Sequence, residues 1–159
     1  MNMLVVMCGI PGSGKSTYAK KLIEMHPDWK YVSRDEVRYE YVTDQAHYFD
    51  HENEVYKEFC NRIDMHLLNG CTVIADATHL NKASRDKLLR SLTAPIDKKV
   101  AIVVNTAFTI CMERNAAREG ITRVPDQSMY RMKNMFKRPN LVVEDFDQVL
   151  NVNGGKIHD

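Results

Sequence analysis

The sequence predicts an α/β fold, with a parallel five-stranded sheet and helices on both of its faces. Apolar runs typical of strands alternate with amphipathic stretches typical of helices along the 159 residues, and this alternation favours parallel strands joined by helical crossovers. The run 99–105 is almost continuously apolar, as expected for a strand buried on both faces. No repeat, low-complexity segment or linker interrupts the pattern, so we expect one domain over 1–159.

The individual elements follow from the periodicity of apolar residues. The strands are expected at 3–8, 30–33, 71–76, 99–105 and 147–153. The helices are expected at 16–25, 52–68, 81–92, 107–118 and 126–137. In the second helix, apolar residues recur every four positions and therefore share one face, at Val55, Phe59, Ile63 and Leu67. In the first helix the same argument predicts a buried side at Tyr18, Leu22 and Met25.

Residues 9–17, GIPGSGKST, join the first strand to the first helix and fit the pattern G-x-x-x-x-G-K-[ST] of a phosphate-binding loop. Backbone N–H groups of such a turn, together with the positive helix N-terminus, favour a polyphosphate. Lys15 is expected to reach the β- and γ-phosphates and to act in catalysis, and the Ser16 hydroxyl is expected to ligate Mg²⁺. ATP and Mg²⁺ are therefore the expected cofactors. The nucleotide-binding residues of the loop are expected to be Gly9, Gly12, Ser13, Gly14, Lys15, Ser16 and Thr17.

Two further strands end in polar segments, SRDEVR after the second and DATHLN after the third. Ligands of open parallel sheets bind beyond the carboxyl ends of the strands, so these segments are expected to meet the loop. Asp35 and Arg38 lie one helical turn apart and share a face. The carboxylate of Asp35 is suited to accept the proton of an attacking hydroxyl, and the planar fork of Arg38 is suited to hold an anion on the acceptor. The alternative is a surface i,i+3 ion pair without function.

Asp76 ends the third strand, where an acid could hold a Mg²⁺-bound water or orient the acceptor. A structural cap of the next loop is the alternative. The expected acceptor-binding residues are therefore Arg38, Asp76 and Thr78.

A basic segment at about 114–125, which contains AAREGITRVP, is predicted to be a mobile lid between two helices. Arginine stabilises the charge that develops on a transferred phosphoryl group, and lid closure excludes water. Arg118 is the expected catalytic and nucleotide-binding residue of this segment, ahead of Arg114 and Arg123. A solvated basic face is the alternative.

The amino-acid composition limits the classes of partner that we expect. A net charge of +1 argues against a protein that coats nucleic acid by overall attraction, although residues 111–138 carry seven bases against three acids. The four cysteines show no metal-binding spacing and fit a reducing cytoplasm. The apolar runs are too short for a membrane span, and no targeting pattern is present. We therefore expect a cytoplasmic protein with no membrane partner.

Together, GIPGSGKST, SRDEVR, DATHLN and RNAAREG…VP…SMYRMKNM resemble the kinase domain of phage polynucleotide kinase, from the first strand to about residue 136. The resemblance implies a P-loop NTPase fold of the nucleoside- and adenylate-kinase type. It also implies ATP-dependent phosphorylation of the 5′-hydroxyl end of DNA or RNA in nucleic acid repair. By resemblance, Asp35 is the general base, Arg38 binds the 3′ phosphate of the acceptor, and Arg118 touches the ATP phosphates. Lys15 and Ser16 match the ATP- and metal-binding residues, and Asp76 matches the aspartate after the third strand.

The sequence also departs from that family. The phage enzyme has a phosphatase domain with a D-x-D-G-T signature, and the only similar stretch here, DFDQV at 145–149, lacks the Gly-Thr. A similar small P-loop kinase of nucleosides, antibiotics or other small hydroxyl compounds is therefore an alternative. A non-enzymatic nucleotide-dependent switch is a third, and it would need a water-positioning residue in place of the acceptor base.

Overall fold

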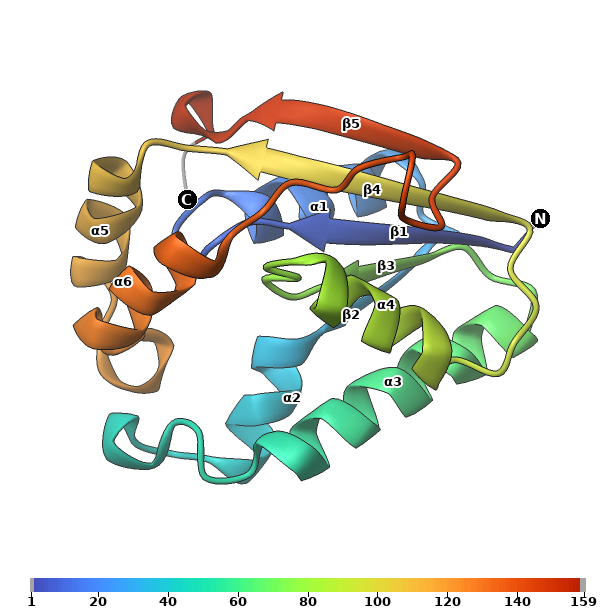
Figure 1. Ribbon diagram of the computed structural model, residues 1–159. Coiled ribbons are helices and arrows are strands. Elements are labelled where there is room, and N and C mark those ends of the chain that lie inside the picture. The colour runs from blue at the N-terminus through green and yellow to red at the C-terminus, as the bar shows by residue number, and fades with distance from the viewer. Residues whose placement is uncertain (1, 158–159) are drawn as a thin grey trace.

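The computed structural model describes residues 2–157 and confirms the α/β fold (Figure 1). Five strands form one sheet in the order β2-β3-β1-β4-β5, and every neighbouring pair is parallel. The strands are β1 (Met3–Cys8), β2 (Lys30–Ser33), β3 (Val73–Asp76), β4 (Lys98–Asn105) and β5 (Gln148–Asn153). The helices are α1 (Lys15–Met25), α2 (Arg34–Tyr41), α3 (Glu52–Leu68), α4 (Lys82–Ser91), α5 (Phe108–Ala116) and α6 (Asp126–Met135).

Alternate side chains of the central strand serve the two faces of the sheet, because successive residues of a strand point to opposite sides. Leu4, Val6 and Cys8 of β1 belong to a core cluster with residues of α3 and α4. Val5 and Met7 belong to a second cluster with α1. The sheet therefore has helices on both faces, as predicted.

The expected faces of the helices are confirmed in α3 and only in part in α1. The four apolar residues of α3 at every fourth position are fully buried, namely Val55, Phe59, Ile63 and Leu67. In α1, Tyr18 and Leu22 pack against the sheet together with Ala19. Met25 is 71% exposed. The prediction was wrong at Met25 because it lies in the last turn, where the chain leaves α1 at His26.

Three helices near the candidate site differ from the prediction. α5 and α6 each end two residues earlier than expected, at Ala116 and Met135. The segment RDEVR forms part of α2, whose first turn is capped by the Ser33 hydroxyl accepting from the backbone N–H of Glu36 at 3.2 Å. Such a serine cap satisfies an N–H group that the helix itself leaves unpaired.

A buried polar group holds the loop between β3 and α4. His79 has a left-handed backbone (φ 43°), and its Nδ1 donates to the carbonyl oxygen of Met7 at 2.7 Å. Arg85 donates to the carbonyl oxygen of His79 at 2.8 Å and pairs with Glu144 at 2.6 Å, in a pair that is almost fully buried. Burial lowers the pKa of His79 to about 4, so the ring is neutral in the folded protein.

The lowered pKa of His79 predicts that the folded protein loses stability in mild acid. The unfolded chain binds a proton at the ordinary pKa of 6.5, whereas the folded chain resists it until about pH 4. Stability is therefore full above pH 6.5 and falls as the pH drops towards 4, by about 2 kcal/mol between pH 7 and pH 5. Urea unfolding at pH 7, 6 and 5 measures this loss.

The control is His79→Asn, since asparagine keeps a donor for Met7 and tolerates a positive φ. This variant should lose about 2 kcal/mol less than the wild type over the same pH range. An equal loss in both proteins would assign the acid sensitivity to other groups.

Candidate active site

The phosphate-binding loop, residues 9–16, lies at the carboxyl edge of the sheet. Gly12 and Gly14 have left-handed backbones (φ 82° and 93°), which favour glycine. A Cβ on Gly12 would lie 2.6 Å from the carbonyl oxygen of Cys111, so this position also lacks room for a side chain. The backbone N–H of Gly9 donates to the carbonyl oxygen of Thr78 at 3.0 Å, which ties the loop to the end of β3. Lys15 is buried at the start of α1.

A second set of contacts supports the loop from the C-terminal part of the chain. The guanidinium of Arg114 donates to the carbonyl oxygens of Gly12 at 3.1 Å, of Gly154 at 3.0 Å and of Ile157. The hydroxyl of Thr106 donates to the carbonyl oxygen of Ser13 at 2.7 Å. Arg114, which the sequence analysis assigned to the lid segment, lies in α5 and braces the loop.

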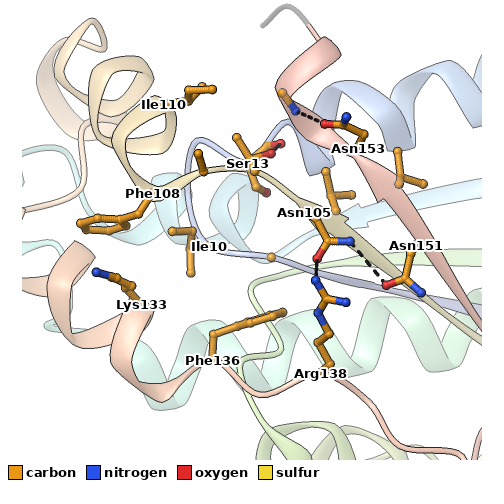
Figure 2. Close-up of a pocket in the computed structure, with 16 residues that line it drawn as sticks. Ile10, Ser13, Asn105, Phe108, Ile110, Lys133, Phe136, Arg138, Asn151 and Asn153 are labelled. Atoms are coloured by element: carbon orange, nitrogen blue, oxygen red, sulfur yellow. Dashed lines mark hydrogen bonds between the residues drawn. The ribbon is translucent and has the colours of Figure 1, made fainter.

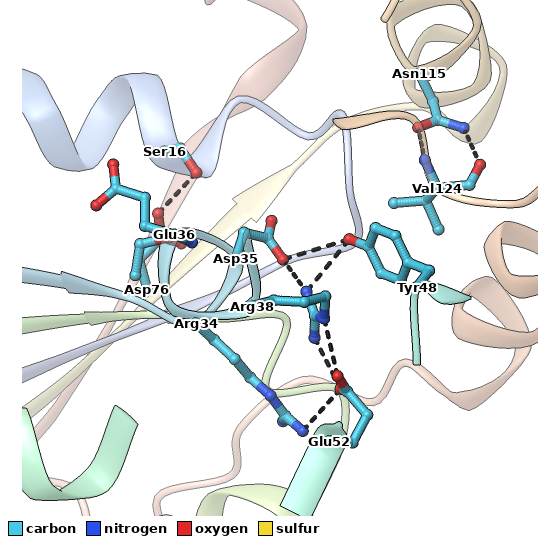
Figure 3. Close-up of polar contacts among 11 residues, drawn as sticks. Ser16, Arg34, Asp35, Glu36, Arg38, Tyr48, Glu52, Asp76, Asn115 and Val124 are labelled. Atoms are coloured by element: carbon cyan, nitrogen blue, oxygen red, sulfur yellow. Dashed lines mark hydrogen bonds and ion pairs between the residues drawn. The ribbon is translucent and has the colours of Figure 1, made fainter. Parts of the chain in front are cut away.

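Asp76 lies beneath the loop, next to Ser16. One of its oxygens, Oδ2, accepts a hydrogen bond from Ser16 Oγ at 2.7 Å (Figure 3). The same oxygen accepts a hydrogen bond from Tyr31 Oη at 2.5 Å. The other oxygen, Oδ1, is buried without a partner among the described residues. Burial, followed by the charge of Asp76, raises the pKa of Tyr31 well above its ordinary value, so this hydroxyl remains a donor. Tyr31 was missed because it lies inside β2, in a strand pattern that carries no chemical signal.

This arrangement fits a magnesium ion. Mg²⁺ prefers oxygen ligands and is commonly held by one or two carboxylates together with substrate phosphates. A hydroxyl and a carboxylate with an unpaired buried oxygen meet that requirement at Ser16 and Asp76. Asp76 does not line the cavity that contains Asp35. The two side chains therefore fit the metal role, which is one of the three roles that the sequence left open for Asp76.

A small cavity of about 170 Å³ opens beside Lys15, at the ends of β2 and β3. Its lining includes the three expected residues Asp35, Arg38 and Thr78 together with Lys15. The expected meeting of the strand ends is thus observed for these four residues. We call this space the acceptor cavity.

One wall of the acceptor cavity is an ion-pair network centred on Arg38 (Figure 3). Arg38 donates from Nε and Nη2 to the two carboxylate oxygens of Glu52, at 2.9 and 2.8 Å. From Nη1 it donates to Asp35 and to Tyr48 Oη, the latter at 3.2 Å. Burial alone would lower the pKa of Arg38, but the hydrogen bonds that it donates to Glu52 and the charge of Asp35 raise this pKa overall. Arg38 is therefore charged at every working pH.

Three members of this wall, Arg34, Tyr48 and Glu52, were missed by the sequence analysis. Arg34 Nη2 donates to Glu52 at 3.2 Å. The only signal for Arg34 was its place in RDEVR. Glu52 begins α3 and resembles any acidic residue at a helix N-terminus, so it carried no signal of its own.

The predicted lid is attached at several points. Asn115 donates to the carbonyl oxygen of Val124 at 2.8 Å and accepts from its N–H at 2.9 Å (Figure 3). The side chain of Gln45 donates to the carbonyl oxygen of Arg123 at 2.9 Å. Arg118 lies close enough to Tyr39 of α2 to oppose the rise of its pKa, which burial takes to about 12.

A larger cavity of about 790 Å³ adjoins the outer side of the loop at Gly9, Ile10 and Ser13 (Figure 2). Arg138 donates to Asn105 there at 2.7 Å. This cavity contains none of Lys15, Asp35, Arg38 and Thr78. The expected catalytic residues Lys15 and Asp35 line the smaller acceptor cavity instead, so that cavity is the candidate for the chemistry.

Residues 2–157 lack two further features. No group of three or more His, Cys, Asp or Glu side chains in this part of the chain could by itself hold a metal ion. No helix in the same range is long and apolar enough to cross a membrane.

Solved structures with the same fold include several kinases. A chain of the Pnkp1/Rnl/Hen1 complex is 23% identical, with a TM-score of 0.63, and the match covers 92% of this chain and 43% of that one. A fungal RNA kinase is 16% identical, with a TM-score of 0.68 and coverage of 94% and 38%. A gluconokinase from Sinorhizobium meliloti 1021 is 17% identical, with a TM-score of 0.60 and coverage of 96% and 82%. This chain spans less than half the length of the two RNA-related proteins.

The family model described as AAA domain matches residues 4–139, which include the phosphate-binding loop, α2, α3 and the predicted lid. The structural neighbours share the fold at low identity and include both an RNA kinase and a gluconokinase. The finer resemblance to phage polynucleotide kinase therefore remains a proposal. The chain belongs to the AAA domain family and shares its fold with solved kinase structures.

Proposed function

We propose that this protein transfers the γ-phosphate of ATP to the 5′-hydroxyl end of DNA or RNA. The observation that carries the proposal is that Asp35 and Lys15 line the same small cavity. Asp35, as a base for the acceptor hydroxyl, and Lys15, as a cation for the donor phosphates, would then act in the same space. A switch that only hydrolyses or senses a nucleotide has no need of the base.

In the proposed mechanism, the loop and Lys15 bind the β- and γ-phosphates. The carboxylate of Asp35, of which 39% is exposed, accepts the proton of the acceptor hydroxyl. As that oxygen bonds to the γ-phosphorus, the bond to the bridging oxygen of ADP breaks, and ADP leaves. Ser16 and Asp76 would hold Mg²⁺, which neutralises charge on the phosphates when it is bound. Arg118 approaches with the lid and stabilises the transferred group.

Two arginines at the acceptor cavity support an acceptor that carries a phosphate. Arg34 and Arg38 both line the cavity, and arginine forks suit phosphate geometry. The presence of an RNA kinase among the structural neighbours agrees with this choice. The second candidate is a kinase of a small hydroxyl compound. The small volume of the cavity and the gluconokinase neighbour favour it.

A transfer assay with γ-labelled ATP tests the proposal. The acceptors are 5′-hydroxyl oligonucleotides of DNA and RNA, nucleoside 3′-phosphates, nucleosides and gluconate. We expect label on the oligonucleotides and nucleoside 3′-phosphates. Label on nucleosides or gluconate without any oligonucleotide product would establish the small-molecule kinase instead.

Replacing the proposed base should reduce turnover and spare ATP binding. Asp35→Asn keeps the shape of the side chain but removes the proton acceptor, so kcat should fall about 100-fold or more. The KM for ATP should stay within about twofold, since Asp35 has no proposed contact with the donor. Steady-state kinetics with a saturating oligonucleotide measure both constants. Glu36→Gln, at the exposed next position of α2, is the control and should behave as wild type. A raised KM for ATP together with a normal kcat would refute the role of Asp35.

The packing of Gly154 against the phosphate-binding loop predicts an effect on the KM for ATP. A Cβ on Gly154 would lie 2.0 Å from Thr106 Oγ1 and 2.1 Å from the carbonyl oxygen of Ser13. Gly154→Ala should therefore push the loop out of place, lower stability by about 1–3 kcal/mol and raise the KM for ATP. Gly155→Ala is the matched control, because its Cβ would meet nothing closer than Asn153 Oδ1 at 3.2 Å. Thermal unfolding and ATP titration compare the two variants. Equal behaviour would mean that this packing does not position the loop.

A further inference from the structure

We infer that Arg34 and Arg38 form a built anion site, that Glu52 occupies it in the free protein, and that a phosphate group displaces Glu52. The geometry of the side chains alone supports the anion site. Only the assignment of the phosphate to the acceptor rests on the proposed function. The inference adds Glu52 and Arg34 to the residues that determine which acceptors bind.

The contacts of Arg38 show that its anion-binding edge is already in use. A guanidinium has five N–H donors in a fixed plane. Glu52 takes the Nε and Nη2 edge in the paired geometry that arginine also offers to phosphate. Asp35 and Tyr48 take Nη1. An acceptor phosphate can therefore use the paired edge of Arg38 only in place of Glu52.

Arg34 provides a second cation with unused capacity at the same point. Its Nη2 donates to the same oxygen of Glu52 that Arg38 Nη2 contacts, at 3.2 Å. Its Nε is buried and has no hydrogen-bond partner among the described residues. Its guanidinium lies 4.9 Å from the centre of the Tyr56 ring, which fixes its position. Both arginines line the acceptor cavity. A phosphate there would meet two arginines, one of which has a donor to spare.

Of the two partners that share the paired edge, Glu52 can move more readily than Arg38. The side chain of Arg38 is only 6% exposed, whereas that of Glu52 is 26% exposed. Glu52 is also the first residue of α3, so its side chain can turn towards solvent while the helix stays in place. Its departure would leave a buried cation without its main partner, which is strongly unfavourable unless another anion arrives. Glu52 therefore leaves only when a phosphate replaces it.

This exchange makes the site selective for phosphate-bearing acceptors. A neutral hydroxyl compound cannot compensate Arg38 and leaves Glu52 in place, whereas a nucleoside 3′-phosphate can take over its contacts. Discrimination between phosphate-bearing and neutral acceptors then comes from competition by Glu52 as well as from the attraction of the arginines to the phosphate.

Binding of inorganic phosphate tests the site without any need for catalysis. Thermal unfolding is followed over a phosphate titration, with chloride at equal ionic strength as the reference. Glu52→Ala removes the competing carboxylate, so it should bind phosphate about tenfold more tightly than wild type and gain more thermal stability from it. Glu52→Gln tests the same point with the shape of the side chain retained, should the alanine variant fail to fold. Glu54→Gln is the matched control, since Glu54 lies in the same first turn but is exposed and pairs with His51. Equal phosphate binding by wild type and both Glu52 variants would overturn the inference.

Kinetics distinguish this role from simple positioning of Arg38. With a nucleoside 3′-phosphate as acceptor, Glu52→Gln should lower the KM several-fold, and with the corresponding nucleoside the KM should not change. A raised KM for the 3′-phosphate would mean that Glu52 holds Arg38 in place for the ligand, and would refute the exchange. If the wild type phosphorylates neither acceptor, the proposed function fails, while the phosphate titration still decides the anion site.

Discussion

The acceptor side of this molecule depends on the buried guanidinium of Arg38. It joins α2 to the start of α3 through Glu52 and to the segment between them through Tyr48, and it contacts the proposed base Asp35. A buried arginine is costly unless its partners are complete, so the cation dictates how these segments come together. The same cation sets the electrostatics of the acceptor cavity.

The donor side is organised by backbone contacts. On one side, Gly9 of the phosphate-binding loop is tied to Thr78, just after β3. On the other side, Arg114 joins Gly12 of the loop to Gly154 near the C-terminus. The two sides meet at Lys15, which lies at the start of α1 and lines the acceptor cavity. Parallel strands bring both sides to one edge of the sheet, which is why residues far apart in sequence share one small space.

Much of this arrangement could be predicted because it follows from local rules. The strand-loop-helix motif specified Lys15 and Ser16, and the strand ends specified Asp35, Arg38 and Thr78. The network around Arg38 could not be predicted in the same way. Glu52 lies on the polar start of α3 and Tyr48 lies in the segment before it, and the role of both depends on tertiary contacts. Arg114 was assigned to the lid because composition alone does not distinguish an arginine that faces a ligand from one that binds backbone carbonyls. Met25 was misplaced for a similar reason, since periodicity does not show where a helix leaves the sheet.

The central claim is that the acceptor hydroxyl meets Asp35 in the cavity beside Lys15. The most direct measurement is a crystal structure of the protein with a non-hydrolysable ATP analogue, Mg²⁺ and a nucleoside 3′-phosphate. The account predicts the 5′-oxygen at about 2.6–3.2 Å from a carboxylate oxygen of Asp35, with the γ-phosphate at Lys15 and the 3′-phosphate on Arg34 and Arg38. An acceptor bound instead in the larger cavity beside Asn105, with Asp35 still paired only to Arg38, would contradict it.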